Sequence, residues 1–170
     1  MRLILILTAL LAFQSAAASE FDEMKAAAEQ GNADAQYILG LKYAIGAGVP
    51  QNDAEAVKWY RKASDQGLAE AQYSLGYMYD TGEGVPENDA EAFKWYKKAA
   101  DQGYALAQYN LGIMYYSGEG VPENDAEAVK WYRKAAGQGN VYAQFELGLM
   151  YESGIGVPEN NIGAYAWWSM

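Results

Sequence analysis

The residues best suited to chemistry form two acidic runs, Glu87-Asn88-Asp89-Ala90-Glu91 and its copy at residues 123–127. Paired carboxylates can serve as general acid and base, or can bind calcium through their oxygens. The spacing does not match a calcium loop, in which alternating oxygen ligands end in a bidentate Glu. Acidic side chains also suit the first turn of a helix, where N–H groups are unpaired. Because the run recurs whereas an active site is needed once, we interpret both runs as helix N-termini and expect no metal site.

Other routes to catalysis lack essential groups, because the chain contains no His and no Cys. Zinc fingers, Ser-His-Asp and Cys-His systems, and thiol redox chemistry are therefore excluded. The Gly-x-Gly segments, such as Gly82-Glu83-Gly84, lack the further glycine of a dinucleotide fingerprint, the Lys of a P-loop and a preceding strand. Serines such as Ser74 have no His to activate them and no Ser-x-x-Lys motif. We expect no catalytic residues and no cofactor; a carboxylate-dependent hydrolase is the remaining enzymatic alternative.

The overall charge points away from anionic partners. The 170 residues include 22 Asp and Glu against 12 Lys and Arg, which gives a formal net charge of −10. Binding to nucleic acid or to anionic membranes depends on clustered Lys and Arg, so we expect no nucleic-acid partner. A hydrophobic fraction of 51% with 20% charged residues is typical of a globular protein.

The N-terminal segment has the pattern of a signal peptide. Met1-Arg2 precedes an apolar run from Leu3 to Phe13, and Ala16-Ala17-Ala18 supplies the small residues of a cleavage site. A membrane anchor or a buried first helix is the alternative, but eleven residues fall short of the about 20 needed to cross a bilayer. We therefore expect residues 1–18 to be removed, leaving an exported protein, periplasmic or secreted, without membrane insertion.

From residue 31 onward the sequence repeats with a period of 36 residues. Between residues 67–102 and 103–138, 27 of 36 positions are identical. We place the copies at residues 31–66, 67–102, 103–138 and, incomplete, 139–170, with residues 19–30 as an N-terminal capping helix. The period is marked by one tryptophan in each copy: Trp59, Trp95, Trp131 and Trp167.

Each copy predicts two helices joined by a Gly-x-Gly-Val-Pro loop. In the second copy the first helix carries an apolar stripe and ends near Gly82, because glycine tolerates positive φ. The stripe consists of Ala71, Leu75, Met78 and Tyr79. The second helix follows Pro86, begins with a capping-box-like Asn88 and Glu91, and ends at Gly103. Its buried stripe consists of Ala92, Trp95, Tyr96 and Ala99. Gly76 lies inside the first helix at a cost of about 1 kcal/mol, so we expect it to permit close packing of the second helix.

These patterns predict an all-α fold, because period-two alternation is absent from the sequence. A single helix pair cannot bury its aromatic residues, whereas stacked pairs form one continuous core, as in a superhelical α/α solenoid. Three segments of the second copy, residues 71–79, 82–86 and 90–100, resemble Sel1-like repeats, and the likeness extends over residues 31–170. The resemblance implies a right-handed α/α solenoid related to tetratricopeptide repeats, used as a protein-interaction scaffold and exported in many bacterial members.

The first helix of each copy carries the candidate binding surface. Six of the nine differences between the second and third copies lie in this helix or at its entry, whereas the second helix is almost unchanged. The resemblance assigns its stripe to the concave, ligand-facing side. The candidate residues are Glu70, Tyr73, Tyr77, Asp80, Tyr109, Ile113, Tyr116, Tyr142, Phe145 and Glu152. Tyr and carboxylates suit an interaction surface. For the repeated position of Tyr73, Tyr109 and Phe145, packing between neighbouring helices is an equal alternative.

We therefore expect a non-catalytic protein–protein interaction scaffold whose partner is a protein or peptide with a basic surface. The resemblance adds a sharper version, an immunity protein that neutralises an antibacterial effector. The alternative is a cell-wall-associated glycan-binding protein or hydrolase, since Tyr and Trp also suit sugars. The period would carry the fourth copy to residue 174, so we expect either a truncated chain or an apolar C-terminal end around Trp167 and Trp168 that supports self-association or docking.

Overall fold

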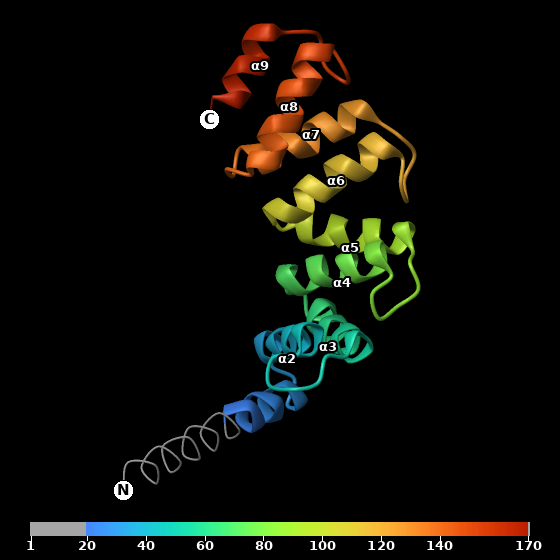
Figure 1. Ribbon diagram of the computed structural model, residues 1–170, viewed down its shortest axis with the longest axis vertical. Helices are drawn as coiled ribbons and strands as arrows, with labels where there is room; N and C mark the ends of the chain where they lie inside the picture. Colours follow the sequence, from blue (N-terminus) through green and yellow to red (C-terminus); the bar gives the residue numbers. More distant parts are fainter. Residues whose placement is uncertain (1–19, 170) are drawn as a thin grey trace, which may run out of the picture.

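A computed structural model describes residues 20–169 of the chain; the expected signal peptide, residues 1–18, lies outside this range. The described residues form helices and no strand, which confirms the predicted all-α class (Figure 1). Residues 20–29 are helical and precede eight further helices. These are α2 (Ala33–Ile45), α3 (Asp53–Asp65), α4 (Ala69–Thr81), α5 (Asp89–Asp101), α6 (Ala105–Ser117), α7 (Asp125–Ala136), α8 (Val141–Ser153) and α9 (Asn161–Trp168).

The helices alternate between two roles. We call α2, α4, α6 and α8 the A helices, and α3, α5, α7 and α9 the B helices. Each A helix packs against the B helix that follows it, and each B helix packs against the next A helix. The pairs are stacked along the long axis of the molecule, as Figure 1 shows from the blue to the red end. The buried residues form four clusters along the stack, and the half-buried Tyr43, Tyr79 and Tyr115 each pack against two successive clusters, which links them as expected for a solenoid.

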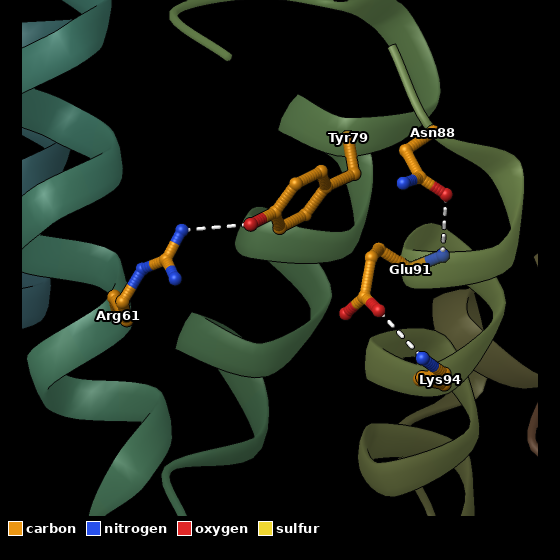
Figure 2. A network of polar contacts seen from close by, with 5 residues as sticks. All are labelled: Arg61, Tyr79, Asn88, Glu91 and Lys94. Atoms are coloured by element: carbon orange, nitrogen blue, oxygen red, sulfur yellow. Dashed lines mark hydrogen bonds and ion pairs between the residues drawn. The ribbon is translucent and has the colours of Figure 1, made fainter. Parts of the chain in front are cut away.

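Local sequence sets the helix boundaries. In the second copy α4 ends at Gly82, where φ is +73°, a left-handed conformation that other residues rarely adopt. At the start of α5, the Asn88 side chain accepts a hydrogen bond from the Glu91 backbone N–H over 3.1 Å (Figure 2). The reciprocal half of the predicted capping box is absent, because the Asn88 N–H donates to the Tyr79 carbonyl and Glu91 pairs with Lys94 instead. The predicted boundaries are confirmed, and the role of Glu91 is corrected.

Gly76 explains how closely the two helices of a copy approach. A Cβ atom at this position would lie only 2.7 Å from Cδ1 of Tyr96, so a side chain has no room. The same contact recurs between Gly40 and Tyr60, and between Gly112 and Tyr132. This confirms the close packing that the sequence predicted, and identifies the tyrosine ring of the B helix as the group that requires it.

A ladder of glutamines, which the repeat pattern alone did not predict, joins successive copies. The buried Gln72 donates to the Ser64 carbonyl of the preceding B helix over 3.2 Å. Gln72 also accepts a hydrogen bond of 2.8 Å from Gln102 at the end of its own B helix. Arg61 adds a second link between copies by donating to the Tyr79 hydroxyl over 2.7 Å (Figure 2). The bonds of Gln72 satisfy a buried side-chain amide, whereas the bond between Arg61 and Tyr79 is an exposed link between copies.

Candidate interaction surface

Large exposed apolar side chains lie on the A helices and on α9. In residues 20–169 the large apolar residues that are exposed all lie on the A helices or on α9, and none lies on α3, α5 or α7. Among the candidate residues, Tyr77 is 42% exposed and Tyr116 is 47% exposed, and Tyr142 and Phe145 are more exposed still. We call the exposed stripe of the A helices that contains these four residues the A face.

The recurring tyrosine position combines packing with partial exposure. The Tyr73 ring lies 5.6 Å from the ring of Tyr96 in its own copy and 5.2 Å from that of Tyr104 in the next copy. Tyr109 makes the equivalent contacts, with Tyr132 at 5.8 Å and Tyr142 at 5.9 Å. Both rings remain half-buried. Tyr73 and Tyr109 thus bridge neighbouring copies, while Phe145, the same position in the fourth copy, is exposed.

The remaining candidates differ in their surroundings. Asp80 is half-buried and accepts a hydrogen bond of 3.1 Å from the Tyr96 hydroxyl. Burial raises the pKa of the Asp80 carboxyl, and the hydrogen bond from Tyr96 opposes that effect. Glu70 and Ile113 are half-buried on α4 and α6, and Glu152 is exposed near the end of α8. Asp80 therefore holds a buried hydroxyl, whereas Glu152 is open to solvent.

Two hollows lie between successive A helices at equivalent places, 72 residues apart in sequence. The first hollow, between α2 and α4, has a volume of about 340 Å³; the second, between α6 and α8, has about 210 Å³. The first is lined by Leu41, Ala44, Ile45, Tyr60, Tyr73, Ser74, Tyr77, Met78 and Glu83. The second is lined by Tyr116, Tyr132, Glu146, Leu149, Met150, Ser153 and Ile155. Three of the candidate residues, Tyr73, Tyr77 and Tyr116, line these hollows, which the sequence pattern did not predict.

Glu146 is a residue of this surface that sequence reasoning missed. It lines the second hollow and is half-buried, and burial raises the pKa of its carboxyl. Its position corresponds to Ser74 in the second copy and Asn110 in the third. The sequence did contain a signal for this residue: at one repeat position a carboxylate replaces the small neutral side chains found in the second and third copies.

Positive charge is concentrated on three of the B helices. The helices α3, α5 and α7 carry nine Lys and Arg residues, whereas α4, α6 and α8 carry none. Each of the nine has a partner within the protein: a carboxylate, a tyrosine hydroxyl or a tryptophan ring. Carboxylates pair with Lys58, Lys94, Lys97 and Lys130; tyrosine hydroxyls accept from Arg61 and Arg133; tryptophan rings lie beneath Lys62, Lys98 and Lys134. The cations of the B helices thus have partners within the protein, and the A helices carry a single cation, Lys42 of α2.

The described residues offer no arrangement typical of a metal centre. No group of three or more carboxylates within residues 20–169 is placed to hold a metal ion. None of the helices in that range combines the length and the apolar character that crossing a bilayer requires. The A helices combine exposed aromatic rings, carboxylates and two hollows, an arrangement suited to recognising side chains of another molecule.

Comparison with known proteins supplies a family. The family model described as the Sel1 repeat matches residues 33–68, 69–104, 105–140 and 141–170. A comparison with curated protein sequences finds no match.

Solved structures of similar proteins include c5321, a protective antigen present in uropathogenic Escherichia coli strains, which is 46% identical over 87% of this chain with a TM-score of 0.86. A Sel1 repeat protein from Oxalobacter formigenes is 41% identical over 83% of this chain, with a TM-score of 0.80. This chain spans 32% of the first of these proteins and 58% of the second. The cysteine rich protein B of Helicobacter pylori, 24% identical over 72% of this chain and 93% of its own length with a TM-score of 0.57, shares the fold.

Proposed function

This chain belongs to the Sel1 repeat family, whose members are generally protein-interaction scaffolds, and we propose that it binds a protein or peptide through its A face. The observation that carries the proposal is the division of the surface. Exposed large apolar side chains of residues 20–169 occur on the A helices and α9, and the cations of α3, α5 and α7 are occupied within the protein. Exposed tyrosines such as Tyr77 and Tyr116 supply the rigid aromatic anchors that dominate many interfaces.

We propose further that the partner presents a basic surface. The chain carries a net charge of −10, and the helices α4, α6 and α8 have no Lys or Arg to repel a cationic partner. Complementary charge steers association and disfavours partners of like charge. The same charge disfavours nucleic acid as the partner.

Export is part of the proposal, with residues 1–18 acting as a signal peptide. Cleavage after Ala18 would remove Arg2 and leave 11 basic against 22 acidic residues. Intact-mass measurement of the protein recovered from the periplasm or medium should give a chain that begins at Ser19. An exported pool that retains Met1 would contradict the signal peptide.

Crosslinking capture tests the interaction itself. The mature chain serves as bait in a periplasmic extract, alongside a Tyr77→Ala variant and a matched Tyr165→Ala variant that removes an exposed tyrosine from α9. We expect capture of a specific partner to be lost with Tyr77→Ala and retained with Tyr165→Ala. Loss with Tyr165→Ala alone would contradict the A face and would favour docking or self-association at the C-terminal end.

The identity of the captured molecule separates the finer roles. An antibacterial effector as the captured protein would make this chain an immunity protein. Retention of the purified mature chain on isolated peptidoglycan, lost with Tyr77→Ala, would instead favour the glycan-binding alternative. Release of soluble fragments from that peptidoglycan would favour the carboxylate-dependent hydrolase.

A further inference from the structure

The second hollow has a half-buried carboxylate on its helical wall, whereas the carboxylate that lines the first hollow, Glu83, is an exposed loop residue. Glu146 of α8 faces a space bounded by Tyr116 of α6 and floored by Tyr132 of α7. Within residues 20–169 the Glu146 carboxylate enters no ion pair, and no Lys or Arg lines the hollow. At the equivalent position of the first hollow, the wall carries the neutral Ser74. A half-buried carboxylate without a cationic partner costs free energy that a bound cation would recover.

The junction of α4 and α6 lies between the two hollows and is equivalent to them in the repeat, but its acidic residue has a partner within the protein. There Asp80 accepts a hydrogen bond from the hydroxyl of Tyr96, the counterpart of Tyr132. The acid at that junction therefore has a partner within the protein, whereas the Glu146 carboxylate has none among the side chains of residues 20–169. At the second hollow an incoming cation would complete an interaction of the half-buried Glu146 carboxylate instead of displacing a partner within the protein.

We propose that the second hollow takes one lysine or arginine side chain of the protein partner, with its cation on the Glu146 carboxylate and its methylene stem against Leu149 and the Tyr116 ring. This rests on the proposed function and adds the chemistry of the partner's anchoring residue. A volume of about 210 Å³ lies below the range of about 300–1,000 Å³ typical of small-molecule sites, which favours a single side chain as occupant.

Each wall of the hollow matches one part of such a side chain. The stems of Lys and Arg are apolar and pack well on aliphatic and aromatic surfaces, such as those of Leu149 and Met150. The charged head gains a charge-assisted hydrogen bond with the carboxylate and is attracted to the faces of tyrosine rings. A norleucine side chain has a similar apolar stem but no charge, so it would gain only the packing on Leu149 and Met150. The proposal therefore requires that the hollow bind Lys and Arg more tightly than norleucine.

Three pentapeptides test the proposal by NMR titration of the isotope-labelled mature chain. They share the sequence acetyl-Ala-Ala-X-Ala-Ala-amide, with Lys, Arg or norleucine at X. Because a single side-chain contact gives dissociation constants near the millimolar range, titration to about 10 mM is needed. We expect saturable shifts of the amides of Glu146, Leu149 and Met150 with the Lys and Arg peptides, and at least fivefold weaker binding of the norleucine peptide. Equal binding of the norleucine peptide, or no saturable shift with Lys or Arg, would overturn the proposal.

Glu146→Gln removes the charge while keeping the side-chain shape, and Glu159→Gln, at an exposed carboxylate in the loop between α8 and α9, is the matched control. We expect Glu146→Gln to weaken the Lys peptide about tenfold, as for the loss of one charge-assisted hydrogen bond, and Glu159→Gln to change it less than twofold. If both variants weakened binding of the Lys peptide equally, the cause would be the change in net charge, and a specific site at Glu146 would be refuted. If the Glu146 site were refuted in this way, the proposed function would still hold as long as partner capture depended on Tyr77, which lines the first hollow.

Discussion

Replacing Gly76 by alanine tests the helix packing on which the A face depends. In an isolated helix this change is favourable by about 1 kcal/mol, because glycine loses more backbone entropy. Here the added Cβ would lie 2.7 Å from Cδ1 and 2.9 Å from Cε1 of Tyr96. The Tyr96 ring is fully buried, and its hydroxyl is held by Asp80, so the ring cannot move aside freely. We expect the packing cost to exceed the gain in helix propensity.

The magnitude follows from these two opposing terms. Overpacking a tightly packed core costs about 1–3 kcal/mol, and the fixed ring places this site near the upper value. Subtracting the propensity gain of about 1 kcal/mol leaves a net loss of about 2 kcal/mol in the free energy of unfolding. For a chain of this length that corresponds to a fall of about 4–8 °C in the melting temperature. Circular dichroism at 222 nm during heating and urea titration measures both quantities.

Gly137→Ala is the matched control, because it makes the same chemical change at a site with ordinary helical φ. The nearest atom to its Cβ would be the Arg133 carbonyl oxygen at 3.3 Å, and Asp65 and Asp101 carry side chains at the equivalent positions. We expect this variant to be unchanged or stabilised by up to about 1 kcal/mol. A Gly76→Ala protein as stable as the wild type would refute the argument.

A double-mutant cycle identifies the cause of the effect. In a Tyr96→Leu background the ring is absent, so Gly76→Ala should become neutral or stabilising even though Tyr96→Leu is itself destabilising. An undiminished cost of Gly76→Ala in that background would show that the Tyr96 ring is not the group that excludes a side chain at residue 76.

Three further substitutions test the core, the caps and the second hollow. Trp131→Ala should lower the free energy of unfolding by about 3–5 kcal/mol in urea titration, because the ring is buried, whereas Tyr77→Ala should cost less than about 1 kcal/mol. Asn88→Ala should cost about 1 kcal/mol through loss of the cap on α5, measured in the same way. Because burial raises the folded-state pKa of Glu146, its charge destabilises the fold at neutral pH, and that cost disappears as the pH falls through the folded-state pKa. Glu146→Gln should therefore melt above the wild type at about pH 7, and the difference should narrow as the pH is lowered toward the ordinary pKa range of a glutamate carboxyl; a difference that widens on acidification would contradict the raised pKa.

The amino-acid sequence by itself determined the repeat, the helix class and the helix ends. These features depend on local geometry: the period of 36 residues, the left-handed glycine at the end of α4 and the side-chain cap of Asn88 involve residues close in the chain. The spacing of Gly76 also indicated a close approach of two helices, because a recurring glycine inside a helix requires a packing reason. The exposed stripe of Tyr77 and Tyr116 followed from helical periodicity in the same way.

Tertiary structure decided which side chains are available to a partner. Glu91 satisfies the capping pattern, yet its carboxylate pairs with Lys94 because the N–H that it would have accepted from is bound to Tyr79 of the preceding helix. Glu146 and Asp80 are both acids on A helices. The packing of α4 on α5 gives Asp80 a hydroxyl partner, whereas the packing of α8 against α6 and α7 leaves Glu146 facing a hollow. The N–H of Asn88 meets a carbonyl nine residues earlier and the Asp80 carboxylate meets a hydroxyl 16 residues later, so both differences depend on how the A and B helices pack. Helical periodicity fixes the direction of a side chain relative to its own helix axis, whereas the stacking of copies fixes what that side chain meets.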